Sequence, residues 1–263
     1  MNIIKKFIFL LYGYFINDSP TALGKGFVRR IIGKHMGTAN YTIDGIKLDL
    51  NPTALYDQYL LYGIKLNPIL TTVMDEQLSK SSLFIDIGAN IGYFSILAEK
   101  KHGSSVLAFE PSPREMKRFK VNMQKNMCKK IACFECALGK FDKNSILETA
   151  DFSNHGMNKI VTSHSKDTIS VETKKLDQIL NNIDLHKIKL FKIDVEGSEI
   201  DVLEGMTETI ERLNDCKFVV EVSPTYLAEK GYRTDDLYNF FQDYNYSYLY
   251  GKNDAFQWEE VFY

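Results

Sequence analysis

The sequence predicts an α/β fold with a doubly wound, mostly parallel sheet and helices on both of its faces. From residue 83 onward, short apolar runs alternate with amphipathic stretches of helical period, the order expected of strand–helix units. The runs are continuously apolar, as parallel strands must be when helices cover both faces. They are LFIDI (83–87), SVLAF (105–109), IACFECAL (131–138), IKLFKIDV (188–195) and KFVVEV (217–222).

Composition narrows the class of protein. The 263 residues are 44% hydrophobic and include 17 Phe and 15 Tyr, enough for a sizeable core, so intrinsic disorder is excluded. Lys and Arg number 32 against 34 Asp and Glu, and this net charge of −2 gives no support to nucleic-acid binding through a basic surface. No run reaches about 18 consecutive apolar residues, so no membrane-spanning helix is predicted.

The chain is expected to form an N-terminal helical extension over residues 1–38 and one domain over residues 39–263. The stretch YTIDGIKLDL (41–50) alternates around Asp44-Gly45, a dipeptide that predicts a two-stranded hairpin ahead of the sheet. The domain then divides into a hairpin with helices (39–80), a core that contains the apolar runs (81–224) and C-terminal elements (225–263).

The first residues allow three interpretations. Lys5-Lys6 precede the apolar segment FIFLLYGYFI (7–16), which has the outline of a signal peptide, but NDSPTALG follows without an A-x-A cleavage site. A helix docked on the domain is the favoured interpretation. Attachment of residues 1–16 to a membrane surface and a cleaved signal are the alternatives. We expect a cytoplasmic protein, peripheral to the membrane if the surface attachment holds.

Helices are expected between the strands. Two are predicted near 53–63 and 68–79, with Pro68 at a helix start. After SVLAF, Ser112 stands at an N-cap, Pro113 at the first helical position and Glu115 three residues after the cap. The apolar stripe of that helix is expected to pack in the core; it consists of Met116, Phe119, Met123 and Met127. The polar segment 139–174 is expected to hold extra short strands and a loop over the site.

The cysteines are expected to be buried thiols. Cys128, Cys133 and Cys136 match the spacing of three iron–sulfur ligands. However, residues three apart on a strand face opposite sides of the sheet, so Cys133 and Cys136 would not converge on one metal.

A cofactor site is expected at the carboxyl ends of the strands, where open parallel sheets bind ligands. FIDIGANIGYFS (84–95) places Gly88 and Gly92 around a tight loop before a helix, whose N-terminus offers free N–H groups. The second strand ends at Glu110, 22 residues beyond Gly88, and an acid at that distance accepts hydrogen bonds from the hydroxyls of a ribose. Residue 90 is Asn where a dinucleotide fingerprint needs Gly, so the pattern predicts an adenosine-containing cofactor other than a dinucleotide.

The motifs resemble one family. The loop DIGANIG resembles the glycine motif of class I S-adenosylmethionine-dependent methyltransferases. Together with LAFEPSP, LFKIDVEGSEIDVLEGM (190–206) and FVVEVSP (218–224), it resembles the FkbM-type methyltransferases, over about residues 40–224. The resemblance implies the Rossmann-like class I methyltransferase fold and S-adenosylmethionine as cofactor.

The same resemblance assigns the cofactor contacts. It implies that Glu110 holds the ribose and that the methionine side is lined by Asp86, Gly88, Asn90 and Gly92. Ser112 would touch the sugar or cap its helix. Ala137 and Leu138 would lie beside the adenine, with ordinary core packing as the alternative.

The catalytic candidates follow the fourth strand. A hydroxyl acceptor must lose a proton, and a carboxylate within hydrogen-bond reach can take it. Asp194 and Glu196 are the expected catalytic residues, because the end of this strand lies next to the transferred methyl group in the fold that the resemblance implies. No metal is assigned. A divalent cation held by the carboxylate oxygens of Asp194, Glu196 and Glu221 is the alternative. Glu199 is expected to be a favourable charge in the first turn of a helix, and His155 an alternative base.

The leading function is that of an O-methyltransferase, and the resemblance suggests a hydroxyl of a sugar, glycan or related small metabolite as acceptor. A nucleotide-sugar or NAD-dependent oxidoreductase is disfavoured by the missing third glycine. A membrane-peripheral binding protein that kept the fold and lost turnover is the non-enzymatic alternative. Neither the acceptor nor the oligomeric state follows from the sequence.

Overall fold

A computed structural model describes residues 39–52, 54–61, 66–149, 158–165, 167–252 and 258–262. The expected N-terminal extension (1–38), with the segment 1–16, and His155 lie outside the described residues, so the expectations for them stay predictions. Among the helices of the described part, none combines the length and apolar character needed to cross a bilayer.

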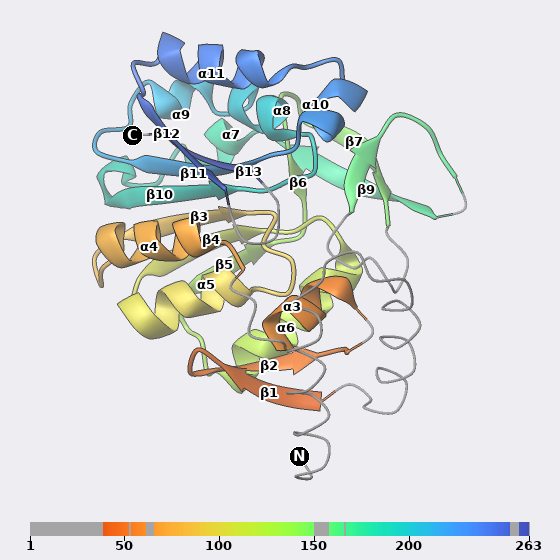
Figure 1. The fold of residues 1–263 in the computed structure, drawn as a ribbon, viewed down its shortest axis with the longest axis vertical. Coiled ribbons are helices and arrows are strands. Elements are labelled where there is room, and N and C mark those ends of the chain that lie inside the picture. Colours follow the sequence, from red (N-terminus) through yellow and green to blue (C-terminus); the bar gives the residue numbers. More distant parts are fainter. Residues whose placement is uncertain are drawn as a thin grey trace.

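A seven-stranded sheet forms the centre of the molecule (Figure 1), in the order β12-β13-β11-β10-β3-β4-β5. The strands from β11 to β5 pair in parallel, and the last two strands add antiparallel, which confirms the expected mostly parallel sheet. Chain order reverses between β3 and β10, so the sheet has its switch point there. The strands are β3 (Leu83–Ile87), β4 (Ser105–Phe109), β5 (Ile131–Phe134), β10 (Ile188–Ile193), β11 (Lys217–Val222), β12 (Tyr248–Lys252) and β13 (Trp258–Phe262).

Helices cover both faces of this sheet (Figure 1). Successive strand residues point to opposite faces, so Leu190 packs in one hydrophobic core and Phe191 in the other. The first face is covered by α3 (Leu55–Leu61), α4 (Pro68–Gln77), α5 (Tyr93–Leu97), which continues as a π-helical turn over Ala98–His102, and α6 (Pro113–Lys125). The second is covered by α7 (Leu176–Leu180), α8 (Glu199–Glu204), α9 (Thr207–Ile210), α10 (Pro224–Glu229) and α11 (Thr234–Asp243), with a 3-10 turn at Leu185–Lys187.

The expected hairpin is confirmed. Strands β1 (Ala39–Ile43) and β2 (Ile46–Leu50) pair antiparallel, with Ile43 opposite Ile46. Asp44 and Gly45 between them have φ of 49° and 78°, the positive values that a two-residue primed turn requires. Alternate residues of β2 are buried against α5 and α6, so the hairpin closes the first core.

One predicted strand is wrong in its extent. The run 131–138 is not a single strand, because β5 ends at Phe134 and Ala137–Leu138 form β6 in a second sheet. This sheet has the order β6-β9-β7-β8 and includes β7 (Lys143–Glu148), β8 (Lys159–Val161) and β9 (Thr168–Lys174). Exposed Glu135 interrupts the apolar run where the chain leaves the edge of the main sheet. The extra short strands expected within 139–174 are confirmed.

The stripe on α6 also differs from expectation at one end. Met116 and Phe119 are fully buried and Met123 packs at the core margin, but Met127 is 75% exposed. The helix ends at Lys125, and a positive φ of 52° at Met127 turns the chain away from the core. The prediction that Met127 packs in the core is therefore wrong.

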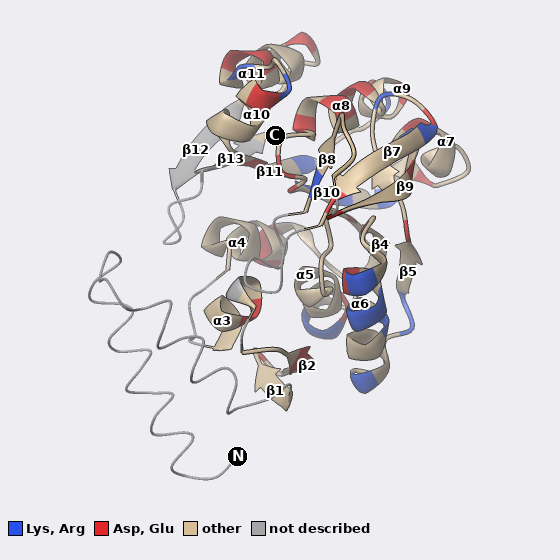
Figure 2. Cartoon of the chain, turned by 90° about the vertical axis from the view of Figure 1, so that its right-hand side faces the viewer, with Lys and Arg blue, Asp and Glu red and all other residues tan. Residues whose placement is uncertain are grey.

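Charge is unevenly distributed over these elements (Figure 2), with Lys and Arg frequent on α6 and Asp and Glu frequent on α8 and α11. Several charges of α6 are neutralised locally. Lys125 pairs with Asp49 at 2.9 Å, and Lys120 pairs with Glu135 at 3.2 Å. Arg118 pairs with buried Asp57, which anchors α3 against α6.

Candidate active site

The glycine loop follows β3 and packs tightly against its neighbours. Gly88 has φ of 81°, and a Cβ there would lie 1.8 Å from the backbone oxygen of Asp194. Gly92 has φ of 82°, and its Cβ would lie 1.9 Å from the ring of Phe119. No side chain fits in such gaps, so glycine at both positions lets the loop sit between β10 and α6.

Glu110 joins this loop to the end of β4. Its Oε2 accepts a hydrogen bond from the backbone N–H of Asn90 at 2.9 Å, and its Oε1 accepts one from Ser112 N–H at 2.8 Å. Burial raises the pKa of Glu110 to about 7, although the bond from Ser112 partly opposes the shift. Each carboxylate oxygen can accept a further hydrogen bond, as a vicinal diol would supply.

Ser112 has the expected position but not the expected cap. It precedes Pro113, the first residue of α6, and thus stands at the N-cap. Its hydroxyl donates to the carboxylate of Glu115 instead of accepting from a backbone N–H of the helix. Ser112 therefore acts on the site through its backbone N–H, which holds Glu110.

A row of polar side chains crosses three neighbouring strands on one face of the sheet. Asp86 of β3 is in register with Lys192 of β10, and the register of Ile193 with Val220 brings Asp194 beside Glu221 of β11. The ammonium Nζ of Lys192 lies 3.1 Å from Asp194 Oδ2 and 3.6 Å from Asp86 Oδ1. The row crosses the switch point between β3 and β10, so the fold brings together groups that are more than a hundred residues apart in the sequence.

Burial and pairing compete along the row. Burial alone would lower the pKa of Lys192, but the charges of Asp194 and Asp86 outweigh it and raise the pKa. Burial favours protonation of Asp194, yet the Lys192 charge prevails and lowers its pKa. Asp86 is fully buried beneath the loop, accepts a hydrogen bond from Ser95, and has its pKa raised by burial. Lys192 therefore stays charged and keeps Asp194 ionised.

The two catalytic candidates and Glu221 converge. Asp194, Glu196 and Glu221 each offer an oxygen within 4.8 Å of the others. Burial, then the charge of Asp194, raises the pKa of Glu221 well above its usual value. The same two causes raise the pKa of Glu196 to about 8. The cluster thus combines one carboxylate whose pKa is lowered with two whose pKa values are raised.

Helix α10 and strand β8 border Glu196. Gly197 has φ of 95°, and a Cβ there would lie 2.6 Å from the backbone oxygen of Tyr226, so the helix rests directly on this glycine. Lys159 of β8 pairs with Glu229 at 2.8 Å and lies 5.4 Å from the ring centre of Tyr226. Burial, followed by the charge of Glu196, raises the pKa of Tyr226.

The remaining predicted site residues have other surroundings. Ala137 and Leu138 are buried in β6, and Leu138 belongs to the second core. Glu199 begins α8, as its expected place in a first helical turn requires, but it is only 2% exposed. Its Oε1 accepts from the N–H of Gly197 at 3.1 Å, so it supports the loop that contains Glu196.

Sequence reasoning missed Lys192. The signal was a lysine inside the apolar run IKLFKIDV, two residues before Asp194 and hence on the same face of the strand. Glu221 was considered only as a metal ligand, and its place beside Asp194 depends on the strand order and register that the structure shows.

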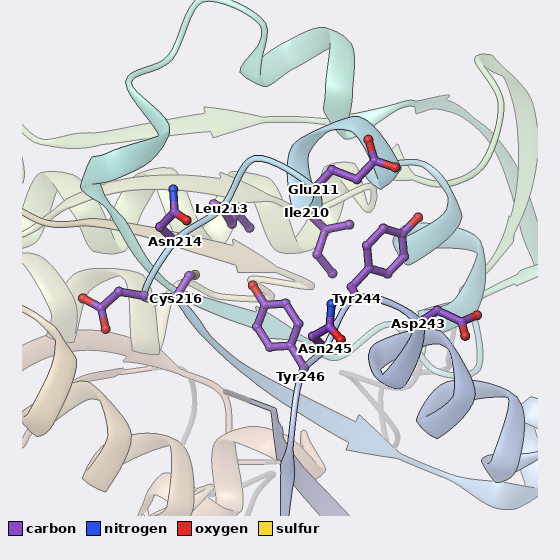
Figure 3. A pocket seen from close by; sticks show the side chains of 10 residues that line it. Ile210, Glu211, Leu213, Asn214, Cys216, Asp243, Tyr244, Asn245 and Tyr246 are labelled. Carbon is purple, nitrogen blue, oxygen red and sulfur yellow. The ribbon is translucent and has the colours of Figure 1, made fainter.

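A separate hollow lies at the opposite ends of the strands, beside the start of β11, and Figure 3 shows the side chains that line it. It measures about 510 Å³ and is lined by residues around Cys216, Tyr244 and Tyr246. Cys216 immediately precedes β11, whereas Glu221 lies near that strand's carboxyl end. This hollow is therefore distinct from the candidate active site.

Doubly wound sheets bind ligands at the carboxyl ends of their strands, where the chain order reverses. The loop, Glu110 and the carboxylate cluster all lie there, so the candidate site stands where α/β enzymes with a doubly wound sheet bind their ligands. The family model described as "Methyltransferase FkbM domain" matches residues 86–248, more than half of the chain. The protein belongs to this family and is a methyltransferase.

Characterised relatives agree with this assignment. "Methyltransferase 1" of Beauveria bassiana is 29% identical over 57% of this chain and 72% of its own length. The hexuronic acid methyltransferase AglP of Haloferax volcanii is 27% identical over 53% of this chain and 56% of its own. The 2-O-methyltransferase NoeI of Sinorhizobium fredii is 27% identical over 49% and 59%, respectively. The chain thus spans little more than half the length of the last two.

Proposed function

We propose that this protein is an S-adenosylmethionine-dependent O-methyltransferase that acts on a hydroxyl of a sugar, glycan or related small metabolite. The observation that carries the proposal is the position of Glu196, whose pKa is raised to about 8. It lies beside Asp194 at the carboxyl ends of the strands, where the glycine loop also lies. A base that titrates near neutral pH suits the removal of a hydroxyl proton.

The cofactor residues fit this proposal. Gly88 and Gly92 leave room that any Cβ would fill, and Glu110 has two buried oxygens able to accept from a ribose diol. We assign Gly88, Asn90 and Gly92 to the methionine side, with Asp86 supporting the loop from below. When bound, S-adenosylmethionine supplies an electrophilic methyl group on a sulfonium, so the protein has to align the acceptor and exclude water.

Two carboxylates divide the acceptor chemistry. Asp194, held ionised by Lys192, is assigned to orient the acceptor hydroxyl through a hydrogen bond. Glu196, whose carboxyl group is the weaker acid of the two, is assigned to take the proton. This division follows from the opposite pKa shifts of the two groups.

The acceptor class is supported by two relatives. AglP is a hexuronic acid methyltransferase and NoeI a 2-O-methyltransferase, and both are similar to this chain over about half of its length. Sugar hydroxyls are weak acids, which is the case where a positioned base contributes most.

Thermal unfolding with S-adenosylmethionine, and with NAD as control, tests the cofactor. A ligand at 100 times its dissociation constant stabilises a protein by about 2.7 kcal/mol, or roughly 5–10 °C for a domain of this size. We expect a shift with S-adenosylmethionine and none with NAD. A shift with NAD alone would support an oxidoreductase, and no shift with either would support a binding protein without turnover.

Methyl transfer to a panel of sugar acceptors then tests the reaction. The three carboxylates also have the oxygen ligands that hard divalent cations prefer, so each assay is run with EDTA and with added Mg²⁺. Unchanged rates in EDTA are expected if the carboxylates act by themselves. Loss of activity that Mg²⁺ restores would replace the base mechanism with a metal-assisted one.

A further inference from the structure

Lys192 has an unusual environment for a lysine. It lies in the central strand β10 and is only 3% exposed. A buried ammonium costs several kcal/mol unless its charge and its hydrogen bonds are satisfied. Here Nζ donates to the backbone oxygen of Gly88 at 2.9 Å and pairs with the carboxylates of Asp194 and Asp86.

These contacts join two functional parts of the site. Gly88 begins the loop assigned to the cofactor, and Asp194 belongs to the cluster assigned to the acceptor. Their backbones already meet, since a Cβ on Gly88 would overlap the Asp194 oxygen. The Lys192 side chain adds a second link, from the Gly88 carbonyl to the Asp194 carboxylate.

We propose that Lys192 is a positioning residue for methyl transfer, which fixes the cofactor loop and the Asp194 carboxylate in one geometry. The inference rests on the proposed function and adds a residue to it. Without the ammonium, the Gly88 carbonyl loses its donor and the Asp194 carboxylate loses the charge that orients it. A 1 Å displacement of groups that must align with a reacting centre is enough to slow a reaction substantially.

If Lys192 had a purely structural role and only balanced the charge of Asp86, removing both charges together should leave cofactor affinity as it is in Asp86→Asn. Asp86→Asn removes that charge and keeps the link from Lys192 to Gly88. The double variant Asp86→Asn/Lys192→Met removes the charges of Asp86 and Lys192 together, which keeps the charge balance below the loop. It also removes the link from Lys192 to Gly88. Lys189→Met is the matched control, because Lys189 lies on the same strand and pairs only with exposed Asp215 at 2.8 Å among the described contacts.

The test compares these variants with the wild type by thermal unfolding, by calorimetric titration with S-adenosylmethionine, and by hydrogen exchange of the loop amides 88–92. We expect Lys189→Met to bind the cofactor within about threefold of the wild type, and Asp86→Asn, whatever its own affinity, is the reference against which the double variant is compared. The double variant should keep its melting temperature within a few degrees of Asp86→Asn, weaken binding about tenfold or more, and exchange faster at the loop, as loss of a charged hydrogen bond implies.

The possible outcomes separate the two ideas. Normal affinity and normal loop exchange in the double variant would overturn the positioning role while leaving the proposed function intact. A wild-type protein that binds no S-adenosylmethionine would overturn the proposed function and the role of Lys192 together. If the double variant unfolds, Lys192→Gln, which keeps an N–H donor for Gly88, replaces it. Lys192→Gln is then compared with a Lys192→Met variant of equal melting temperature. If the two bind the cofactor equally weakly, the retained N–H donor has no effect, and the link to Gly88 is overturned.

Discussion

The carboxylate of Glu110 accepts a hydrogen bond from the backbone N–H of Asn90, which ties the end of β4 to the middle of the glycine loop. Two strand ends of the parallel sheet are therefore held at a fixed separation by one buried acid. The same acid is the group assigned to the cofactor ribose, so loop geometry and ribose binding depend on one side chain and on its protonation state.

Cofactor affinity should depend on pH through Glu110. Burial raises its pKa to about 7, and only the ionised form accepts from two ribose hydroxyls. As pH falls below 7, the protonated form dominates and the dissociation constant for S-adenosylmethionine should rise, by up to about tenfold per pH unit. Calorimetric titration between pH 5.5 and 8.5 measures this. Glu110→Gln should bind weakly at every pH and Glu110→Ala not at all, and a Gln variant with the wild-type pH dependence would contradict the assignment.

A methyl group added at Gly88 should disrupt the site. Gly88→Ala combines a left-handed φ of 81° with a Cβ 1.8 Å from the Asp194 oxygen, so the loop or β10 has to move. We expect loss of cofactor binding and a free energy of unfolding lower by several kcal/mol. The matched control is Gly231→Ala, which has φ of 83° and no atom within 4 Å of its Cβ. It should cost only about 1 kcal/mol, the price of the backbone conformation. Equal losses from the two changes would show that packing against Asp194 is unimportant.

The pH profile of methyl transfer should follow Glu196. Because its pKa is about 8 and the base must be ionised, kcat should increase with pH up to about 8 and then level off. Glu196→Gln should lower kcat by about 10²–10⁴-fold and remove this dependence. Asp194→Asn should lower turnover with cofactor binding largely kept. Loss of cofactor binding in Asp194→Asn would instead make Asp194 a cofactor anchor.

Stability should fall as pH rises through neutrality. Burial raises the pKa of Glu199 to about 7, so the folded protein binds this proton more tightly than the unfolded chain does. The associated stabilisation is fully present below about pH 4.3, the unfolded value, and is lost as pH rises through 7. Glu199→Gln removes the titration, so the variant should gain up to about 3 kcal/mol relative to wild type between pH 5 and pH 8. Urea unfolding at both pH values measures the difference, and parallel pH dependences would contradict the buried state of Glu199.

Much of the fold could be predicted because local signals agreed with tertiary structure. The bounds of β3, β4 and β11 match the apolar runs, and Pro68 and Pro113 each begin a helix. The extent of 131–138 failed because an edge strand is only half-buried, so its apolar pattern does not reveal where pairing changes from one sheet to another. Met127 failed because helical spacing continued two residues beyond the point at which the helix ends.

The site was predictable in its residue types more than in its electrostatics. Glu110, Asp194 and Glu196 could be located because strand ends converge at one edge of a parallel sheet. The pKa of Asp194 is lowered by the charge of buried Lys192, whereas burial and the charge of Asp194 raise the pKa of Glu196, and no local pattern encodes this burial and strand register. The roles of His155 and of the N-terminal segment stay predictions.

Gly197, the residue after Glu196, limits how the C-terminal elements can pack near that carboxyl group. Gly197 carries no side chain because the backbone of α10 lies against it, which sets how close the C-terminal elements come to Glu196. A C-terminal segment of different sequence could pack beside Glu196 in the same way only if one backbone stays in contact with Gly197. Replacement of α10 as a unit, with Gly197 retained, should therefore change the surface beside Glu196 and leave the glycine loop 88–92 in place.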